Sequence, residues 1–523
     1  MVTQPKPKRN EVLLLLGICA VAAAVRFIGI GAQALWLDES FTWRITGGSL
    51  THLFNRVSAL ETTPPLSYLL IWLSRQAFGS SEFALRFAPA VAGVLTVPAV
   101  WLGGRRLFGQ RAGLFAAALT AVSPFMWWYS QEARAYSLAA LLCALMFAAY
   151  AYRVTGGGTL ALVGWAAAAA AAVATQYSTA AVVIATFTAL LTTDRNRWKQ
   201  VALAGLAPLL AAAALFNLAM EQAGHGMTDW IASIPLGERF AQLFLQPWAG
   251  TATANFGVPL YTCAALSLLM GCALVVIGRR QTGQRREALG NVGWILLASA
   301  LLLSAFLLVG GDRVLARYYI VIWPIAAVAA AAAIAAVRIK AAITVIALVC
   351  GVMLALVIRI EATPSLQRLD WRPVAAALGP APLHGRLIII QNYPYWQALQ
   401  PYMKGLEPFG VLSGQYPVSV EVVTIRAGEP SSCWWCTARG ADGVFPPAKA
   451  VGFFPLAASI PAGRFKITSY RASNPFEFER QRIPITGQIV GASLAGTISS
   501  GVVLFQHGPP DPYTTAIRKQ QKK

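Results

Sequence analysis

The stretch L-W-L-D-E-S-F-T-W-R, Leu35–Arg44, sets two adjacent carboxylates among aromatic residues. Asp38 and Glu39 follow closely on the first long apolar run, Val12–Gly31. Tryptophan is enriched where lipid meets water, so we expect the chain to leave a bilayer at this stretch. Carboxylates are costly to hold at that depth, which marks the pair as a candidate functional site. The alternative is a solvated acidic pair in an ordinary loop.

The composition is that of a membrane protein. The 523 residues are 57% hydrophobic and only 12% charged, with a mean hydropathy of +0.57. Soluble domains carry about 25% charged residues. The net charge is +21, but Lys and Arg lie in short clusters between apolar runs and form no basic, aromatic-containing face. This pattern argues against nucleic acid as a partner and favours contact with anionic membrane lipids.

Apolar runs long enough to cross a bilayer recur as far as Ile358. About 20 apolar residues in a helix span the ~30 Å hydrocarbon core, and we expect about eleven such helices. The expected spans are Val12–Gly31, Glu82–Gly103, Ala112–Tyr129, Ala135–Tyr152, Leu160–Ala174, Ser178–Leu191, Val201–Met220, Val258–Ile277, Val292–Val309, Tyr318–Val337 and Ala341–Ile358. Amphipathic helices lying in the interface are expected at Thr62–Gly79 and Ile231–Pro247.

The charges between the runs predict the orientation. Cytoplasmic loops of membrane proteins carry an excess of Lys and Arg. A cytoplasmic N-terminus puts every strongly basic linker on that side, namely 105–111, Arg153, 194–199, 279–286 and 338–340. The outer side then receives Asp38-Glu39, Gln131-Glu132, Gln176-Tyr177, Glu221 and Gly310–Arg317. We expect a multi-pass protein of the bacterial cytoplasmic membrane whose site faces the periplasm.

The composition changes near Arg359, which predicts a membrane domain over residues 1–359 and an outer domain over 360–523. Strands are predicted at Arg386–Gln391 and Val418–Ile425, and helices at Trp371–Leu378 and Tyr395–Met403. The fold class is therefore a polytopic α-helical membrane protein with a C-terminal mixed α/β domain.

Two features of this outer domain have alternative interpretations. Ile485–Phe505 is uncharged and long enough for a twelfth span, although its alternating pattern favours strands. Cys433 and Cys436 form a C-W-W-C pair that suits a disulfide, the alternative being a redox motif.

Five features converge on the predicted outer side. They are Asp38-Glu39, the block W-W-Y-S-Q-E-A-R at Trp127–Arg134, the block G-G-D-R-V-L-A-R-Y-Y at Gly310–Tyr319, the turn Thr62–Pro65, and Gln176-Tyr177. A carboxylate at a membrane exit suits a general base for a hydroxyl acceptor. Arg317 offers planar donors for a phosphate at headgroup depth, the alternative being an arginine that snorkels. The alternative for Glu132 is an ion pair with Arg134.

The order L-W-x-D-E, P-P-L, S-P-F-x-x-W-Y-S-Q-E-A-R-x-Y and A-R-Y-Y resembles the GT-C superfamily of polyprenyl-phosphate-sugar glycosyltransferases. The likeness is to the branch of the protein O-mannosyltransferases and the lipid A aminoarabinose transferase, over roughly Asn10–Val337 and Asp370–Leu378. It implies inverting transfer, on the outer side, from a polyprenyl-phosphate-sugar donor to a glycan, lipid or protein acceptor.

The resemblance also implies roles for residues of this chain. Asp38 would match the catalytic aspartate of the first loop, and Glu132 the acidic or metal-adjacent position of the second outer loop. Arg317 would face the lipid phosphate. The remaining expected contacts are Arg313 and Tyr318 on the phosphate, and Glu39, Gln131, Arg134, Gln176 and Tyr177 on the substrates. Some relatives use a divalent cation; here Mg or Mn would be oxygen-ligated, with Asp38 and Glu132 as candidate ligands.

This chain departs from many relatives in having Thr63 where they have His before P-P-L, and Gln176 where they have His-Tyr. Other classes of many-span protein stay open. A flippase or transporter would place ionisable groups at mid-membrane, and the expected spans have almost none there. A surface-polysaccharide polymerase or ligase, or a non-catalytic scaffold, is a further alternative.

Overall fold

The computed structural model describes residues 7–225, 228–250, 260–280, 282–382, 385–391, 396–408, 418–427, 456–463, 465–477 and 502–506. The chain divides into two compact units. The first comprises Met1–Ala32 and Phe41–Pro364, and the second comprises Gln33–Ser40 and Ser365–Lys523. The short segment that carries Asp38 and Glu39 thus groups with the C-terminal part of the chain.

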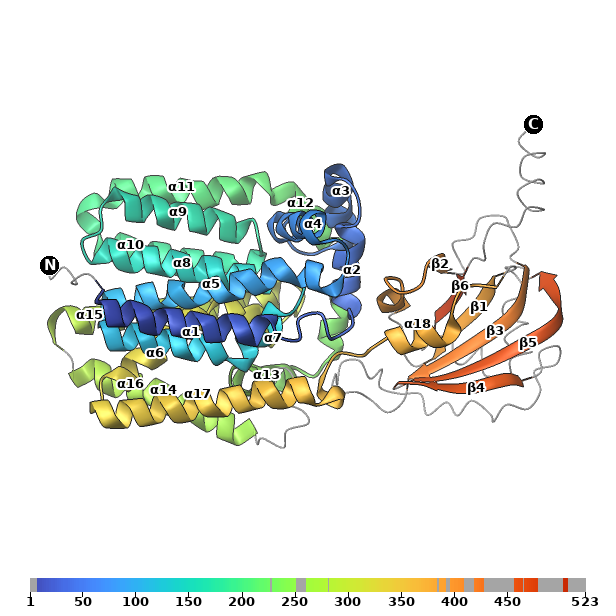
Figure 1. The fold of residues 1–523 in the computed structure, drawn as a ribbon. Coiled ribbons are helices and arrows are strands. Elements are labelled where there is room, and N and C mark those ends of the chain that lie inside the picture. The colour runs from blue at the N-terminus through green and yellow to red at the C-terminus, as the bar shows by residue number, and fades with distance from the viewer. Residues whose placement is uncertain are drawn as a thin grey trace. The chain divides into compact units, whose positions relative to one another are not determined.

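The first unit is built of helices that run side by side (Figure 1). Its longest helices are α1 (Arg9–Phe27), α5 (Glu82–Phe108), α8 (Tyr136–Val154), α14 (Leu260–Arg280), α15 (Gly283–Val309) and α17 (Ile339–Ala362). The shorter ones are α3 (Leu50–Leu60), α4 (Leu66–Phe78), α6 (Gln110–Val122), α7 (Pro124–Ser130), α9 (Thr159–Val173), α10 (Ala180–Thr193), α11 (Trp198–Ala214), α12 (Phe216–Ala223), α13 (Leu236–Ala249) and α16 (Trp323–Ala335). Short 3₁₀ turns are η1 (Tyr177–Thr179), η2 (Arg195–Arg197), η3 (Asp229–Ser233) and η5 (Ala316–Val321). Helix α2 (Leu37–Ile45) begins in the second unit and ends in the first.

The apolar helices mark the chain as a membrane protein. Among the described residues, five helices are long and apolar enough to cross a membrane, or seven if each of two bent pairs is one span. Each of the eleven expected runs lies on helix, but several of these helices have only 13–15 residues. The number of spans therefore stays a prediction.

Proline and a serine cap explain the sharper of the two bends. Helices α6 and α7 meet at 56°. Pro124 is the first residue of α7 and has no N–H to continue the ladder of α6. The Ser123 hydroxyl accepts a hydrogen bond from the Met126 amide at 3.3 Å, which caps the new helix. The bend ends α7 at Ser130, directly before the Gln131-Glu132 pair.

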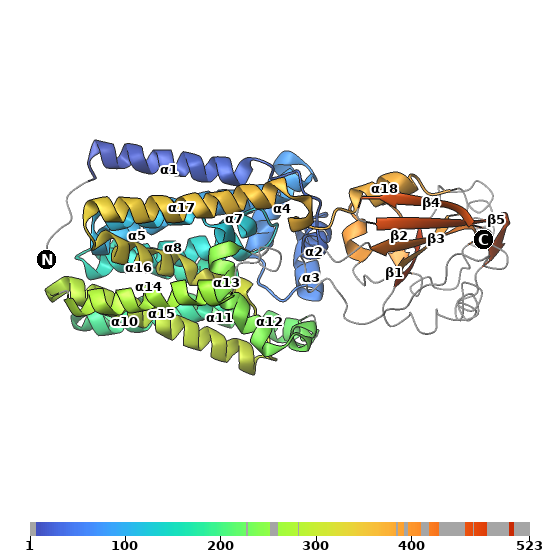
Figure 2. The ribbon, with the colours of Figure 1, turned by 90° about the horizontal axis from the view of Figure 1, so that it is seen from below.

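A fully buried arginine joins α1 to this bend. The Arg26 guanidinium donates to the Ser130 hydroxyl at 3.2 Å and to the carbonyls of Ala121 and Thr120 at 2.7 and 3.0 Å. Helix α5 approaches closely at Gly93, where an added Cβ would lie 2.1 Å from the Ser130 Oγ. Figure 2 shows α17 along another face of the unit, where it contacts α13 and α16.

The expected helix in the first outer loop is confirmed as α4, which begins directly after Pro65. In the second expected region, α13 begins at Leu236 after the turn η3. The position of both helices at a membrane interface stays a prediction.

The second unit contains α18 (Arg372–Leu378) and a six-stranded sheet in the order β2-β6-β1-β3-β5-β4. The strands are β1 (Arg386–Gln391), β2 (Leu406–Pro408), β3 (Val418–Ala427), β4 (Leu456–Ala462), β5 (Phe465–Glu477) and β6 (Val502–Gln506). Only the β1–β3 pair is parallel among the described pairings. Ile388 and Ile390 of β1 lie opposite Val423 and Ile425 of β3, and all four are buried with Trp371.

The strands predicted at 386–391 and 418–425 are therefore present. The helix predicted at Tyr395–Met403 is wrong in length, because the described residues form only the 3₁₀ turn η7 (Trp396–Leu399). Pro401 follows it and cannot continue a helix. The end of Ile485–Phe505 lies in strand β6, and the rest of that segment, like Cys433 and Cys436, lies outside the described residues.

Candidate functional site

In the second unit, the segment Gln33–Ser40 is anchored by Arg368 and Tyr402. The Glu39 side chain is fully buried, with its Oε2 3.9 Å from the Arg368 Nε. Arg368 also donates to the Gln33 side chain, and the Leu35 amide donates to the Tyr402 hydroxyl at 2.7 Å. Glu39 thus has an ion-pair partner within its own unit, and its predicted contact with substrate stays a prediction.

Asp38 lies in the first turn of α2 and is partly exposed. Residues four apart share one face of a helix, so Asp38 lies one turn before Thr42. The Thr42 hydroxyl accepts from the Arg134 guanidinium at 3.5 Å, and the Thr42 carbonyl accepts from the Thr46 hydroxyl at 2.7 Å. A side chain of the W-W-Y-S-Q-E-A-R block therefore contacts the helix that carries the predicted base.

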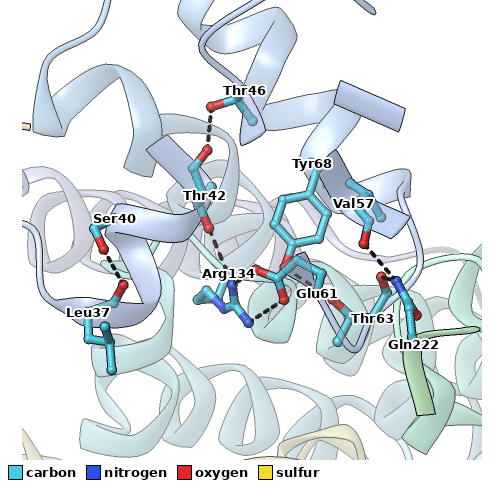
Figure 3. Close-up of polar contacts among 10 residues, drawn as sticks. All are labelled: Leu37, Ser40, Thr42, Thr46, Val57, Glu61, Thr63, Tyr68, Arg134 and Gln222. Atoms are coloured by element: carbon cyan, nitrogen blue, oxygen red, sulfur yellow. Dashed lines mark hydrogen bonds and ion pairs between the residues drawn. The ribbon is translucent and has the colours of Figure 1, made fainter. Parts of the chain in front are cut away.

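Arg134 forms a buried ion pair with Glu61 (Figure 3). The guanidinium donates to both carboxylate oxygens of Glu61, and the bond to Oε2 measures 2.9 Å. It also lies 5.8 Å from the centre of the Tyr68 ring, whose hydroxyl is 3.1 Å from the Thr63 hydroxyl. Burial raises the pKa of Tyr68 well above its ordinary value, so this hydroxyl stays protonated. The pair joins the turn between α7 and α8 to the T-T-P-P turn.

Gln222 of α12 holds the other side of this turn (Figure 3). Its side-chain N–H groups donate to the carbonyls of Val57 and Thr63, each at 3.1 Å. Its side-chain oxygen accepts from the Tyr177 hydroxyl at 3.0 Å. Burial raises the pKa of Tyr177 to about 12, so that hydroxyl remains a donor at neutral pH. Tyr177, a predicted substrate contact, thus has a structural partner.

The A-R-Y-Y block contacts the Y-S-Q-E-A-R-A-Y block through Arg317 and Tyr136, which are 181 residues apart in the chain. The Arg317 guanidinium of η5 lies 6.0 Å from the ring centre of Tyr136 and 5.6 Å from that of Tyr318. The Tyr136 ring in turn packs edge-on against Tyr129 at 4.9 Å. A cation within about 6 Å of an aromatic ring is attracted to the face of that ring. Two predicted motifs therefore meet at one arginine.

The loop before η5 is fixed by a second arginine. Arg239 of α13 donates to both carboxylate oxygens of Asp312, at 2.8 and 2.6 Å, and to its backbone carbonyl at 2.8 Å. These hydrogen bonds lower the pKa of Asp312. Gly311 and Asp312 both have positive φ, of 109° and 54°, which favours glycine and tolerates aspartate. Arg313 thus follows a tightly held turn.

Gln176 is the predicted site residue with the clearest unmet hydrogen-bonding capacity. Its side chain is 2% exposed, and neither its nitrogen nor its oxygen has a hydrogen-bond partner among the described residues. The Ser178 hydroxyl, two residues later, is also buried and has no hydrogen-bond partner among the described residues. Buried polar groups normally have partners, and an unsatisfied group calls for a functional explanation. Gln176 directly precedes η1, and η1 contacts η5, which carries Arg317.

Gln131 and Glu132 lie in the turn between α7 and α8. The Gln131 side-chain amide donates to the carbonyls of Arg26 and Ile28, at 3.2 and 3.1 Å. The Glu132 side chain is fully buried, and its backbone carbonyl accepts from the Arg134 amide at 2.7 Å. Gln131 thus holds the end of α1, and a role for either residue in binding substrate or metal stays a prediction.

A divalent cation is the one cofactor that the sequence suggests. Among the described residues, no group of three or more His, Cys, Asp or Glu side chains is arranged to hold a metal ion. The described side chains alone therefore provide no complete ligand set for a metal ion.

Sequence reasoning missed Glu61, Tyr68, Gln222 and Arg368. Each of them contacts a residue more than 60 positions away in the sequence. Glu61 stands directly before the T-T-P-P turn, which is the one sequence signal that pointed to its neighbourhood.

A protein-family model matches the part of the chain that contains several of these motifs. Residues 62–219 match the model of the dolichyl-phosphate-mannose-protein mannosyltransferase family. This range contains the P-P-L turn, the Y-S-Q-E-A-R-A-Y block and Gln176-Tyr177. The predicted resemblance to the GT-C glycosyltransferases is confirmed. The matched family is one of mannosyltransferases, which agrees with the predicted enzyme class, glycosyltransferase. No curated protein matches this chain significantly.

Solved structures with the same fold include ArnT from Cupriavidus metallidurans bound to undecaprenyl phosphate. It is 14% identical with a TM-score of 0.53, and the match covers 88% of this chain and 98% of that one. The apo form of ArnT is 17% identical with a TM-score of 0.44, over 62% of this chain and 60% of that one. The oligosaccharyltransferase AglB from Archaeoglobus fulgidus, in complex with an inhibitory peptide and a dolichol-phosphate, is 13% identical with a TM-score of 0.46, over 71% and 57%. The chain thus spans less than two thirds of the apo ArnT and AglB chains that it matches.

Proposed function

We propose that this chain transfers a sugar from a polyprenyl-phosphate donor to an acceptor hydroxyl, with inversion, on the outer face of the bacterial cytoplasmic membrane. The contact between Arg317 and Tyr136 carries the proposal. It brings the Arg317 guanidinium to the block that most resembles glycosyltransferases of this kind. A phosphate is the ligand that such a guanidinium binds best.

The reaction follows from the chemistry of the donor. The acceptor oxygen attacks the anomeric carbon while Asp38, as general base, takes the hydroxyl proton. The bond between that carbon and the phosphate oxygen breaks, and its electron pair leaves on the polyprenyl phosphate. Arg317 stabilises the charge that develops there, and Arg313 and Tyr318 lie close to it in sequence. Asp38 and Glu132 as ligands of a divalent cation stay a prediction.

Gln176 is suited to recognise the sugar. A buried carboxamide offers two donors and an acceptor, which match neighbouring hydroxyls of a pyranose. Both polar atoms of Gln176 lack partners among the described residues, and Tyr177 beside it is held in place by Gln222. The acceptor is a glycan, a lipid or a protein hydroxyl, and Glu39, Gln131 and Arg134 stay predicted contacts around it.

The test is transfer by purified protein from a panel of polyprenyl-phosphate sugars, comparing wild type with Arg317→Gln. Loss of one hydrogen-bond donor to the charge that develops in the transition state slows a reaction about 10²–10³-fold. We therefore expect kcat/KM to fall by that factor. Arg338→Gln, which removes an exposed arginine from a predicted cytoplasmic linker, is the matched control and should leave the rate unchanged. Equal rates for wild type and Arg317→Gln would refute the role of Arg317. Transport of lipid without transfer would favour a flippase.

A further inference from the structure

A polar pocket lies at the opposite end of the helices from the candidate site, among linkers that are rich in arginine. It has a volume of about 450 Å³. The end of α5, the start of α6, the start of α15 and the end of α16 line it, and all belong to the first unit. Arg111 and Arg285 come from segments far apart in sequence and both line the pocket. The remaining wall includes Gly109, Leu289 and Ala336.

The charge of this pocket is uncompensated. Within the part of the chain that the structure describes, neither Arg111 nor Arg285 forms an ion pair with a carboxylate. The nearest carboxylate in sequence, Glu287, does not line the pocket. Helix α6 also begins here, at Gln110, with no side-chain cap and no acidic residue in its first turn. Its free N–H groups add positive potential at the same place.

We infer that this pocket binds the phosphate headgroup of an anionic phospholipid of the surrounding membrane. Arginine guanidinium groups and a helix N-terminus both bind phosphate diesters. Basic pockets between membrane helices are known to bind such headgroups. The apolar part of the wall, Leu289 with the alanines at the end of α16, would contact the first carbons of the acyl chains. The inference does not depend on the proposed transfer reaction.

The pocket differs from other basic surface of the same unit. Arg195 and Arg197 in η2 are also exposed and lie on a linker that is predicted to be cytoplasmic, but they do not line this pocket. Removing them changes the net charge by the same amount as removing Arg111 and Arg285. Substituting Arg195 and Arg197 therefore distinguishes binding at a defined site from general attraction to anionic lipid.

The experiment measures thermal unfolding of the full purified chain in neutral detergent as phosphatidylglycerol or phosphatidylcholine is added. A lipid that binds only the folded protein raises its midpoint with concentration. Phosphatidylglycerol should stabilise wild type more than phosphatidylcholine does. The double variant Arg111→Gln/Arg285→Gln should bind phosphatidylglycerol about tenfold or more weakly, because charge-assisted hydrogen bonds are lost. Arg195→Gln/Arg197→Gln should bind like wild type.

Three results would overturn the inference. They are equal loss of binding in both double variants, no preference for phosphatidylglycerol, and displacement of the lipid by inorganic phosphate at the same concentration. Native mass spectrometry of the same samples counts the retained lipids and checks the shift independently. If the glutamine variant does not fold, Arg111→Lys/Arg285→Lys replaces it, and it should bind more weakly than wild type because the planar forks are gone.

Discussion

The Glu61–Arg134 ion pair is the contact whose removal tests the described site most sharply. Glu61 is 3% exposed and Arg134 is 9% exposed, and both carboxylate oxygens accept from the guanidinium. The change Glu61→Gln keeps the shape of the side chain and removes its charge. Arg134 would then stay buried beside the Thr42 hydroxyl and the Tyr68 ring without the negative charge of Glu61 (Figure 3).

The loss of stability expected for Glu61→Gln follows from the burial of the ion pair. Removing one partner of a buried pair leaves a charge without compensation, which destabilises proteins by about 3–5 kcal/mol. An exposed pair would lose no more than about 1 kcal/mol. We expect Glu61→Gln to lower the free energy of unfolding by the larger amount. Arg134→Met in the Glu61→Gln background should restore part of it, with a coupling energy of about 2–3 kcal/mol.

The assay is equilibrium unfolding in mixed micelles of a denaturing and a mild detergent. Glu221→Gln, the same change at an exposed carboxylate of α12, is the control and should lie within about 0.5 kcal/mol of wild type. Two results would refute the reasoning. One is a Glu61→Gln variant as stable as the control, and the other is strict additivity of the Glu61 and Arg134 changes.

Two further predictions concern packing and pH. Gly93→Ala should lower the free energy of unfolding by about 1–3 kcal/mol, because the new Cβ would lie 2.1 Å from the Ser130 Oγ. Gly290→Ala, with no atom within 4 Å, should raise it by about 0.5–1 kcal/mol in the same unfolding assay, and the opposite order would contradict the packing. Hydrogen bonds from Arg239 lower the pKa of Asp312, so their stabilisation is complete above the ordinary carboxyl pKa of about 3.9 and is lost as the pH falls through the lower folded value. The thermal midpoints of wild type and Asp312→Asn should therefore differ at pH 6 and approach each other towards pH 3, and a constant difference would argue against this pair.

Local patterns predicted the elements well. Runs of apolar residues fell on helices because length and hydropathy are properties of a single segment. Pro65 predicted where α4 begins, because proline suits the start of a helix. The shared side of the Y-S-Q-E-A-R-A-Y and A-R-Y-Y blocks was also predicted, from the order of spans, and the contact between Arg317 and Tyr136 agrees with it.

Partners could not be predicted, because they depend on how segments pack. Arg134 stands two residues after Glu132, but it forms a bidentate ion pair with Glu61, 73 residues earlier. Gln222 reaches Thr63 across 159 residues. No periodicity in the sequence encodes either distance. Likewise, Glu39 was expected to meet substrate, and only the fold shows that Arg368 pairs with it.

The most direct test of the proposed reaction is sugar transfer by wild type beside Asp38→Asn, with the donor found in the panel of polyprenyl-phosphate sugars. The substitution keeps the side chain nearly isosteric and removes its ability to accept a proton. The account predicts that kcat falls by about 10²–10⁴ while the affinity for donor is kept, as expected for loss of a general base. An Asp38→Asn variant that transfers sugar as fast as wild type would contradict it.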